Sequence, residues 1–168
     1  MATLKILIFP DPRLRTVAEP IREVDNSIAK LVEDMFATMY EGEGIGLAAT
    51  QVDIHKRIIV IDISNEKNAP LVLINPKIKR IINNEKKSYS EGCLSVPGIY
   101  EELERPSAVE ICALGLDGKE FTLVAEDLLS VVIQHEMDHL DGKMMVDFLS
   151  NLKREMIRKK MAKLETAQ

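Results

Sequence analysis

The chain has 168 residues, of which 46% are hydrophobic and 29% charged, and these values predict one compact domain over residues 1–168. Its net charge is −5, whereas general nucleic-acid-binding proteins usually carry a net positive charge, so we expect no DNA partner. No apolar stretch reaches the roughly 18 residues of a membrane span. The start of the chain lacks a signal-peptide pattern, and two cysteines do not make a disulfide framework. These features predict a cytoplasmic protein without a membrane partner.

The first predicted helix spans residues 28–40, where apolar side chains recur three or four residues apart. Asp25 or Asn26 can cap its start, and a glycine ends it. Strands are predicted at 57–63 and 71–74, because both segments are rich in β-branched residues. The Asn-Pro pair that follows the second segment is expected to end it.

Residues 108–120 alternate apolar and polar side chains, and the chain returns after an Asp-Gly turn as the segment 121–124. This pattern predicts a β-hairpin. Two more helices are predicted, at 127–140 and 149–164. Because the strands mostly lie between the helices, we predict an α+β fold. Antiparallel sheets would pack around the 127–140 helix, with an N-terminal and a C-terminal helix beside them.

The 127–140 segment contains the sequence HEMDH. His135 and His139 are four residues apart, so both imidazoles project from one helix face, about 6 Å apart, and can bind one metal ion. Glu136 can reach a water molecule at that ion. The H-E-x-x-H pattern is typical of metal-dependent hydrolases, and a catalytic site usually has three protein ligands.

The spacing leaves the third ligand open. Met145 stands where a metzincin has its third histidine, which excludes that class. Glu155 is the nearest later carboxylate, but it lies in a basic segment with its own amphipathic pattern. Cys93 lies in a loop flanked by glycine and proline that can approach a helix face, and either a metal-bound thiolate or a small buried side chain fits there. Cys112 lies in an alternating segment and is expected to fill space near the sheet.

Three motifs resemble those of the peptide deformylases, in that family's order: GIGLAATQ at 44–51, EGCLS at 91–95 and QHEMDH at 134–139. The resemblance extends over most of the chain, including its start and its first and last helices. It implies removal of the formyl group from the N-terminal methionine of newly synthesised polypeptides, with release of formate. A metallopeptidase that cuts other peptide bonds is the nearest rival. A structural metal site with four protein ligands is a second rival.

The resemblance also implies the roles of individual residues. The implied metal ligands are Cys93, His135 and His139. Glu136 would take a proton from water as general base and return it to the leaving amine. The side-chain amide of Gln51 and the backbone N–H of Leu94 would stabilise the oxyanion. Without the resemblance, Gln51 is equally well interpreted as a surface polar residue.

An apolar pocket for the methionine side chain is expected on the metal-bearing side of the 127–140 helix. Two glycines of the first motif would let an extended substrate approach and pair like an added strand. The predicted substrate-binding residues are Gly44, Ile45, Gly46, Leu128, Val131 and Val132. The alternative is that the apolar members are core residues and that the glycines only make a turn.

Charged residues near the motifs are expected to support the site. Glu91 and Asp138 would orient ligands or backbone, and Arg105 is the expected partner of Asp138. Ordinary surface charge is the alternative for all three. Residues 98–104 match no motif, so the sequence does not indicate which residues are preferred after methionine.

By resemblance, Fe²⁺ is the expected native ion, and Zn²⁺, Ni²⁺ or Co²⁺ would be able to replace it, because one cysteine and two histidines suit several divalent ions. The predicted 149–164 helix is basic and amphipathic. Two interpretations of its charge remain: contact with ribosomal RNA, or a solvated face.

Overall fold

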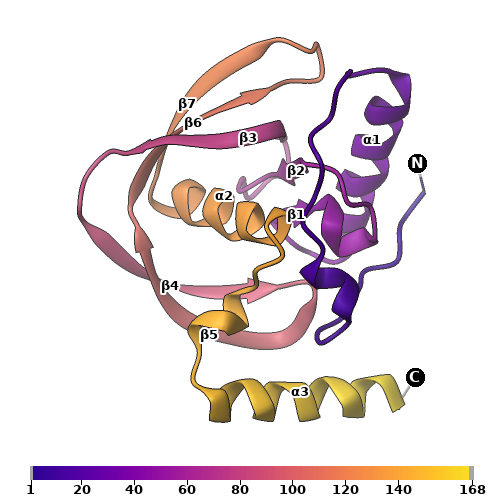
Figure 1. Ribbon diagram of the computed structural model, residues 1–168, viewed down its shortest axis with the longest axis vertical. Coiled ribbons are helices and arrows are strands. Elements are labelled where there is room, and N and C mark those ends of the chain that lie inside the picture. Colours follow the sequence, from indigo (N-terminus) through magenta and orange to yellow (C-terminus); the bar gives the residue numbers. More distant parts are fainter. Residues whose placement is uncertain (1, 167–168) are drawn as a thin grey trace.

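The computed structural model describes residues 2–166, which form a five-stranded antiparallel sheet in the order β1-β2-β3-β6-β7, a separate hairpin and three α-helices (Figure 1). The helices are α1 (Asn26–Glu41), α2 (Asp127–Leu140) and α3 (Asn151–Thr166). The sheet strands are β1 (Gly46–Ala48), β2 (Ile58–Ile61), β3 (Leu71–Ile81), β6 (Ala108–Leu114) and β7 (Glu120–Glu126). The hairpin strands are β4 (Lys86–Cys93) and β5 (Val96–Pro106). The predicted α+β class is confirmed.

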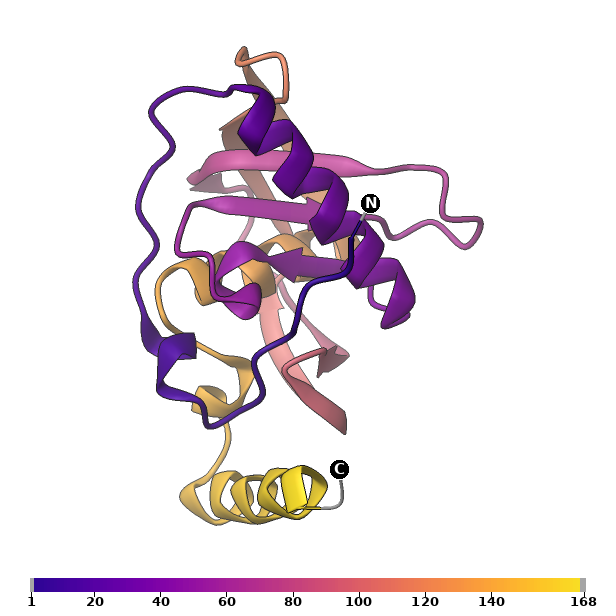
Figure 2. The ribbon, with the colours of Figure 1, turned by 90° about the vertical axis from the view of Figure 1, so that its right-hand side faces the viewer.

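Helix α2 lies between the large sheet and the β4-β5 hairpin, and α1 covers the other face of the sheet (Figures 1 and 2). Strand β2 explains this layering, because successive side chains of a strand point to opposite faces. Ile59 and Ile61 pack with residues of α2, whereas Ile58 and Val60 pack with residues of α1. All four side chains are buried, so β2 is apolar throughout instead of alternating.

Several predicted elements are confirmed. The side chain of Asp25 accepts hydrogen bonds from the backbone of Ser27 and Ile28 and caps α1, which ends at Gly42. The predicted hairpin is β6-β7, with Gly118 at φ +77° in its turn. Within residues 2–166, none of the helices is both long and apolar enough to cross a bilayer.

The expected end of β3 at the Asn-Pro pair is wrong. Asn75 and Pro76 form an irregularity within a longer strand, because the register of β3 against β6 shifts between Ile74 and Lys77. Asn75 adopts φ +51°, and its side-chain amide bonds both the N–H and the C=O of Ile21, at 2.8 Å each. A β-bulge held by a side chain therefore replaces the strand end that the sequence suggested.

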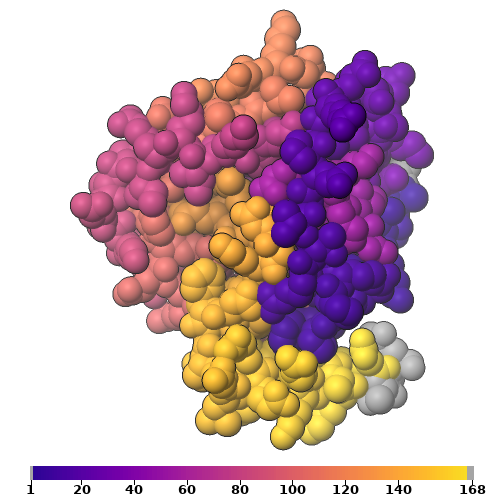
Figure 3. All heavy atoms as spheres, in the orientation of Figure 1, coloured from indigo at the N-terminus to yellow at the C-terminus, as the bar shows by residue number. Residues whose placement is uncertain are grey.

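Helix α3 lies at one end of the molecule, against the N-terminal segment (Figures 2 and 3). It begins at Asn151, two residues later than predicted, and Ser150 Oγ accepts a hydrogen bond from the backbone of Lys153. Ile157 and Met161 pack into a core formed with the N-terminal segment and β5. Of the other predicted apolar positions, Leu152, Met156 and Leu164 are 72%, 57% and 44% exposed, while Leu149 precedes the helix and packs partly buried against the same core.

Candidate metal centre and active site

The EGCLS and HEMDH motifs meet between the hairpin and α2. Cys93 is the last residue of β4, and His135 and His139 project from one face of α2. The Cys93 Sγ and one ring nitrogen of each histidine all lie within 4.8 Å of one another. The Sγ is 3.4 Å from His139 Nε2, and the two ring centroids are 5.1 Å apart. The chain therefore brings one thiol and two imidazoles together at a single point.

The other candidate for a third ligand lies elsewhere, because the Glu155 carboxylate is on the surface, 3.6 Å from Arg158. Met145, at the position of a metzincin's third histidine, is buried in the core beneath α3. Cys112 lies half-buried on β6, outside the cluster. The remaining histidine, His55, pairs with Asp53 near the surface.

The donors of this cluster fit a divalent metal ion. His135 Nδ1 lies 2.9 Å from a Glu91 oxygen, which leaves Nε2 directed toward Cys93 and His139. Such a carboxylate–histidine pair orients the imidazoles of many metal sites. Glu136 Oε1 is buried and has no hydrogen-bond partner within residues 2–166. Buried polar atoms normally have a partner, so this oxygen indicates a site built to hold another group.

Burial sets the protonation of Glu136 and His139, whereas burial alone would lower the pKa of His135 but the neighbouring Glu136, Cys93 and Glu91 hold it well above its ordinary value. It raises the pKa of Glu136 to about 7, so this carboxylate can exchange a proton near neutral pH. Burial also holds the pKa of His139 well below its ordinary value. A neutral imidazole is the form that binds a metal ion.

A buried ion network supports His135 from behind. Arg105 donates to Glu91 from Nε at 2.6 Å and from Nη2 at 3.0 Å, and its Nη1 donates to Asp138 at 2.9 Å. The expected pairing of Arg105 with Asp138 is thus present, and Glu91 is added to it. Burial alone would raise the pKa of Glu91, but hydrogen bonds from His135 and Arg105 lower it. The Phe148 ring covers the Arg105 guanidinium at 5.1 Å.

Gln51 is buried, so its interpretation as a surface residue is wrong. Its Oε1 accepts from the backbone N–H of Ala48 at 3.0 Å, and its Nε2 donates to Ser95 Oγ at 3.0 Å. The same Nε2 lies 3.5 Å from Cys93 Sγ. Two independent contacts therefore fix the amide beside the thiol. Leu94, the residue after Cys93, lies in the turn between β4 and β5.

The glycines of the first motif make room for site residues. A Cβ on Gly46 would lie 2.7 Å from Glu136 Oε2 and 2.9 Å from Val132 Cγ1. A Cβ on Gly44 would lie 2.8 Å from a methyl carbon of Leu94. Side chains of the protein itself therefore occupy the space beside these two α-carbons, and close approach of β1 to α2 requires Gly46.

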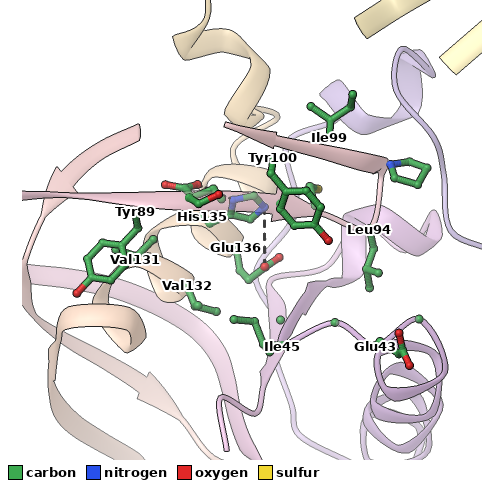
Figure 4. A pocket seen from close by; sticks show the side chains of 18 of the residues that line it. Glu43, Ile45, Tyr89, Leu94, Ile99, Tyr100, Val131, Val132, His135 and Glu136 are labelled. Carbon is green, nitrogen blue, oxygen red and sulfur yellow. Dashed lines mark hydrogen bonds and ion pairs between the residues drawn. The ribbon is translucent and has the colours of Figure 1, made fainter. Parts of the chain in front are cut away.

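A cavity of about 390 Å³ opens beside the cluster (Figure 4). Its volume lies in the usual range for small-ligand sites. All the residues predicted to bind substrate line it: Gly44, Ile45, Gly46, Leu128, Val131 and Val132. The two valines are buried, while Ile45 and Leu128 are 41% and 39% exposed at its rim.

The sequence predictions missed one wall of this cavity. Tyr89, Ile99 and Tyr100 come from the β4-β5 hairpin and line the pocket (Figure 4). The hairpin itself was not predicted, because Gly92, Pro97 and Gly98 interrupt its alternation. The available signal was an aromatic residue on each side of the EGCLS motif, since aromatic residues favour strands.

Comparison with known proteins identifies the family. The profile described as polypeptide deformylase matches residues 3–155. The chain belongs to the polypeptide deformylase family. It is 58% identical to peptide deformylase 1 of Pseudomonas syringae pv. tomato and 60% identical to the peptide deformylase of Azotobacter vinelandii, in both cases over 97% of this chain and 96% of the relative.

Solved deformylase structures share the whole fold. The crystal structure of a peptide deformylase from Legionella pneumophila has a TM-score of 0.93 at 45% identity and covers 99% of this chain and 98% of its own. The Ehrlichia chaffeensis deformylase in complex with actinonin has a TM-score of 0.94 at 42% identity, over 98% of this chain and 99% of its own. This chain is accordingly a metal-dependent hydrolase that removes the N-formyl group from newly synthesised polypeptides.

Proposed function

We propose that Cys93, His135 and His139 hold the catalytic ion, with Fe²⁺ as the native metal and Zn²⁺, Ni²⁺ or Co²⁺ able to replace it. Their convergence within 4.8 Å carries the proposal. When bound, a divalent ion would act as a Lewis acid toward water and the formyl carbonyl. A thiolate ligand on iron is sensitive to oxidation, so activity of the iron form should decay in air and persist with nickel or cobalt.

Glu136 moves the proton in the proposed reaction. It takes a proton from the attacking water and returns it to the amine that leaves when the formyl C–N bond breaks. Two features support this role: burial of the carboxylate raises its pKa to about 7, and its Oε2 lies 4.0 Å from His135 Nε2. The same carboxylate can therefore accept the proton and donate it near neutral pH.

Gln51 and Leu94 stabilise the oxyanion that develops on the formyl oxygen. The Gln51 amide is held by Ala48 and Ser95 before substrate arrives, so it needs no reorganisation during the reaction. The backbone N–H of Leu94 is proposed as the second donor because it directly follows Cys93. The Glu91–Arg105–Asp138 network keeps His135 in its orientation.

The cavity accepts the methionine side chain. Val131 and Val132 form its buried part, and Ile45 and Leu128 form its rim. A thioether is flexible and polarisable, so it fills an irregular apolar pocket well. Backbone groups at Gly44 and Gly46 would pair with the extended substrate beside the β1 edge of the sheet.

The experiment is formate release from formyl-Met-Ala-Ser, compared with cleavage of Met-Ala-Ser and with metal content measured on the same sample. Cys93→Ser and His139→Ala should lose both bound metal and activity. The chain offers matched controls away from the cluster, Cys112→Ser and His55→Ala, which should keep both. Full metal content in Cys93→Ser would contradict the ligand set, and cleavage of the unformylated peptide would point to a peptidase.

The basic side of α3 contacts the ribosome, where nascent substrates emerge in the cytoplasm. Support comes from the exposed lysines of α3. Among its described residues, only Ile157 and Met161 are buried against the rest of the protein, so most of its surface is free to meet a partner. Lys159→Glu combined with Lys160→Glu should weaken co-sedimentation with ribosomes and reduce its salt dependence, with activity on short peptides retained. The proposed contact would be contradicted if the double variant bound ribosomes as tightly as the wild-type protein and if salt did not weaken that binding.

A further inference from the structure

A buried carboxylate that the proposed reaction does not use follows directly after β2. Asp62 is 3% exposed, and the Tyr40 hydroxyl donates to its Oδ2 at 2.6 Å. The backbone N–H and the hydroxyl of Ser64 donate to Oδ1 at 3.0 Å and 2.5 Å, and the Ala69 N–H donates to Oδ2 at 3.3 Å. Burial alone would raise the pKa of Asp62, but these hydrogen bonds lower it, so the carboxylate is ionised at neutral pH.

Asp62 is bonded to both ends of a loop that lines the cavity. This glycine loop, residues 42–45, connects α1 to β1, and Glu43 and Ile45 lie along one side of the cavity (Figure 4). Tyr40 precedes the loop in the last turn of α1, and its carbonyl accepts from the Glu43 N–H at 3.0 Å. At the other end, the Asp62 N–H donates to the Ile45 carbonyl at 2.9 Å. One residue therefore holds both ends, through its side chain at Tyr40 and its backbone at Ile45.

The glycine loop depends on such anchors because core packing fixes little of it. Gly42, Glu43 and Ile45 are all exposed. Glu43 adopts φ +57°, a left-handed conformation that costs about 1 kcal/mol or more for a residue with a side chain. A loop that is exposed and locally strained keeps its shape only if its ends are held.

We propose that Tyr40 and Asp62 are positioning residues that keep the glycine loop in the shape that receives the substrate. This inference rests on the proposed function of the site, in which Ile45 borders the methionine pocket and Gly44 and Gly46 pair with the peptide backbone. A loop that already has its bound shape loses less conformational entropy when substrate binds. The loop carries none of the groups proposed to react, so loss of the anchor should weaken binding and leave the chemical step unchanged.

The test measures kcat and KM for formate release from formyl-Met-Ala-Ser. Tyr40→Phe removes only the hydroxyl, because the Phe36 ring, with its centroid 5.9 Å away, still stacks on the ring at position 40. KM should rise about three- to tenfold, with kcat within about twofold of the wild-type value. The matched control on the same helix is Thr38→Val. It removes a buried hydroxyl that bonds Asp34 and Leu4 instead of the loop, and it should keep both constants.

A second variant tests the same hydrogen bond from the other side. Asp62→Asn removes the charge to which the Tyr40 hydroxyl donates and should also raise KM. Adding Tyr40→Phe to it should raise KM little further, because the two substitutions break one bond. Amide hydrogen exchange in the free proteins should be faster at residues 42–45 in Tyr40→Phe than in Thr38→Val.

The outcomes separate the two levels of the proposal. No formate release by the wild-type enzyme would overturn the proposed function itself. An active wild-type enzyme whose KM is unchanged by Tyr40→Phe and by Asp62→Asn would overturn the anchor alone. An equal rise of KM in Thr38→Val would also overturn it, because any loss on α1 would then have the same effect. A fall of kcat at constant KM in Tyr40→Phe would show that the hydroxyl does not act through binding, and this too would overturn it.

Discussion

Helices α2 and α3 follow each other in the chain but differ in how strongly the fold constrains them. Nine of the 14 residues of α2 are buried between the sheet and the hairpin, and these nine include both histidines and Glu136. Among the described residues of α3, only Ile157 and Met161 are buried. A substitution in α2 therefore meets either the core or the site, whereas most substitutions in α3 meet water.

The charges of the two helices differ in the same way. Asp138 on α2 belongs to the buried network of Arg105 and Glu91, whose side chains are 6% and 4% exposed. Arg158 and Glu155 on α3 form a pair with both side chains more than half exposed. Buried charges must keep their partners, while exposed pairs contribute little. Four predictions test this contrast.

The largest effect is expected for Glu136→Gln. Amide and carboxylate have nearly the same shape, so the fold and metal content should persist, while kcat falls about 10²- to 10⁴-fold with the loss of the base. The matched variant on α3, Glu155→Gln, should retain wild-type kcat. Formate release and metal analysis on both proteins check this. Comparable kcat in the two variants would remove Glu136 from the proton path.

The ion network should respond next. Arg105→Met leaves Glu91 buried without its main partner and should lower the free energy of unfolding by about 3–5 kcal/mol. Arg158→Met on α3 should cost at most about 1 kcal/mol. Urea unfolding at neutral pH measures both. If the two variants lost equal stability, burial would not distinguish the two sets of charges.

The docking of α3 gives a smaller effect. Ile157→Ala should lower the free energy of unfolding by about 2–4 kcal/mol, because it removes buried methyl groups and leaves a cavity. Leu152→Ala, at 72% exposure, should change it by less than about 0.5 kcal/mol. Thermal and urea unfolding distinguish the pair. A large loss in Leu152→Ala would show that the outer face of α3 is covered.

The segment between the two helices gives the smallest, pH-dependent effect. Asp147 accepts from Arg15 at 2.7 Å and 2.9 Å. Burial alone would raise the pKa of Asp147, but the Arg15 hydrogen bonds lower it. The contribution of the ionised Asp147 carboxylate to the free energy of unfolding is thus complete above its unfolded pKa of about 3.9. It is lost as the pH falls through the lower pKa of the folded state. Asp147→Asn should cost about 1 kcal/mol at pH 7 and progressively less toward pH 2, measured by urea unfolding.

The α+β class and the approximate places of α1, α2 and α3 could be predicted because their apolar residues recur with helical spacing. The HEMDH spacing indicated two nearby imidazoles, and the structure brings Cys93 to them. The thiol could not be placed by spacing alone, because it comes from a strand of the hairpin while the histidines lie on a helix. Only the resemblance of the motifs selected it.

Tertiary contacts decided what the sequence patterns could not. Asn75 continues a strand because its amide is bound by Ile21, which is 54 residues away in the chain. The β4-β5 hairpin has exposed residues at most positions of β4, so it lacks an apolar alternation. What favours the pairing of β4 with β5 is the packing of the Tyr100 ring over Gly92, and these two residues meet only in the folded chain.

The bare Cα of Gly46 has a consequence for mutational mapping. A single methyl group at this position would strike the Glu136 carboxylate and Val132 from a strand far away in the chain. Gly46→Ala should therefore behave like damage to the proposed proton carrier, although position 46 has no functional group to lose. A mutational survey that replaces only side chains larger than alanine would pass over a position at which we expect turnover to be lost.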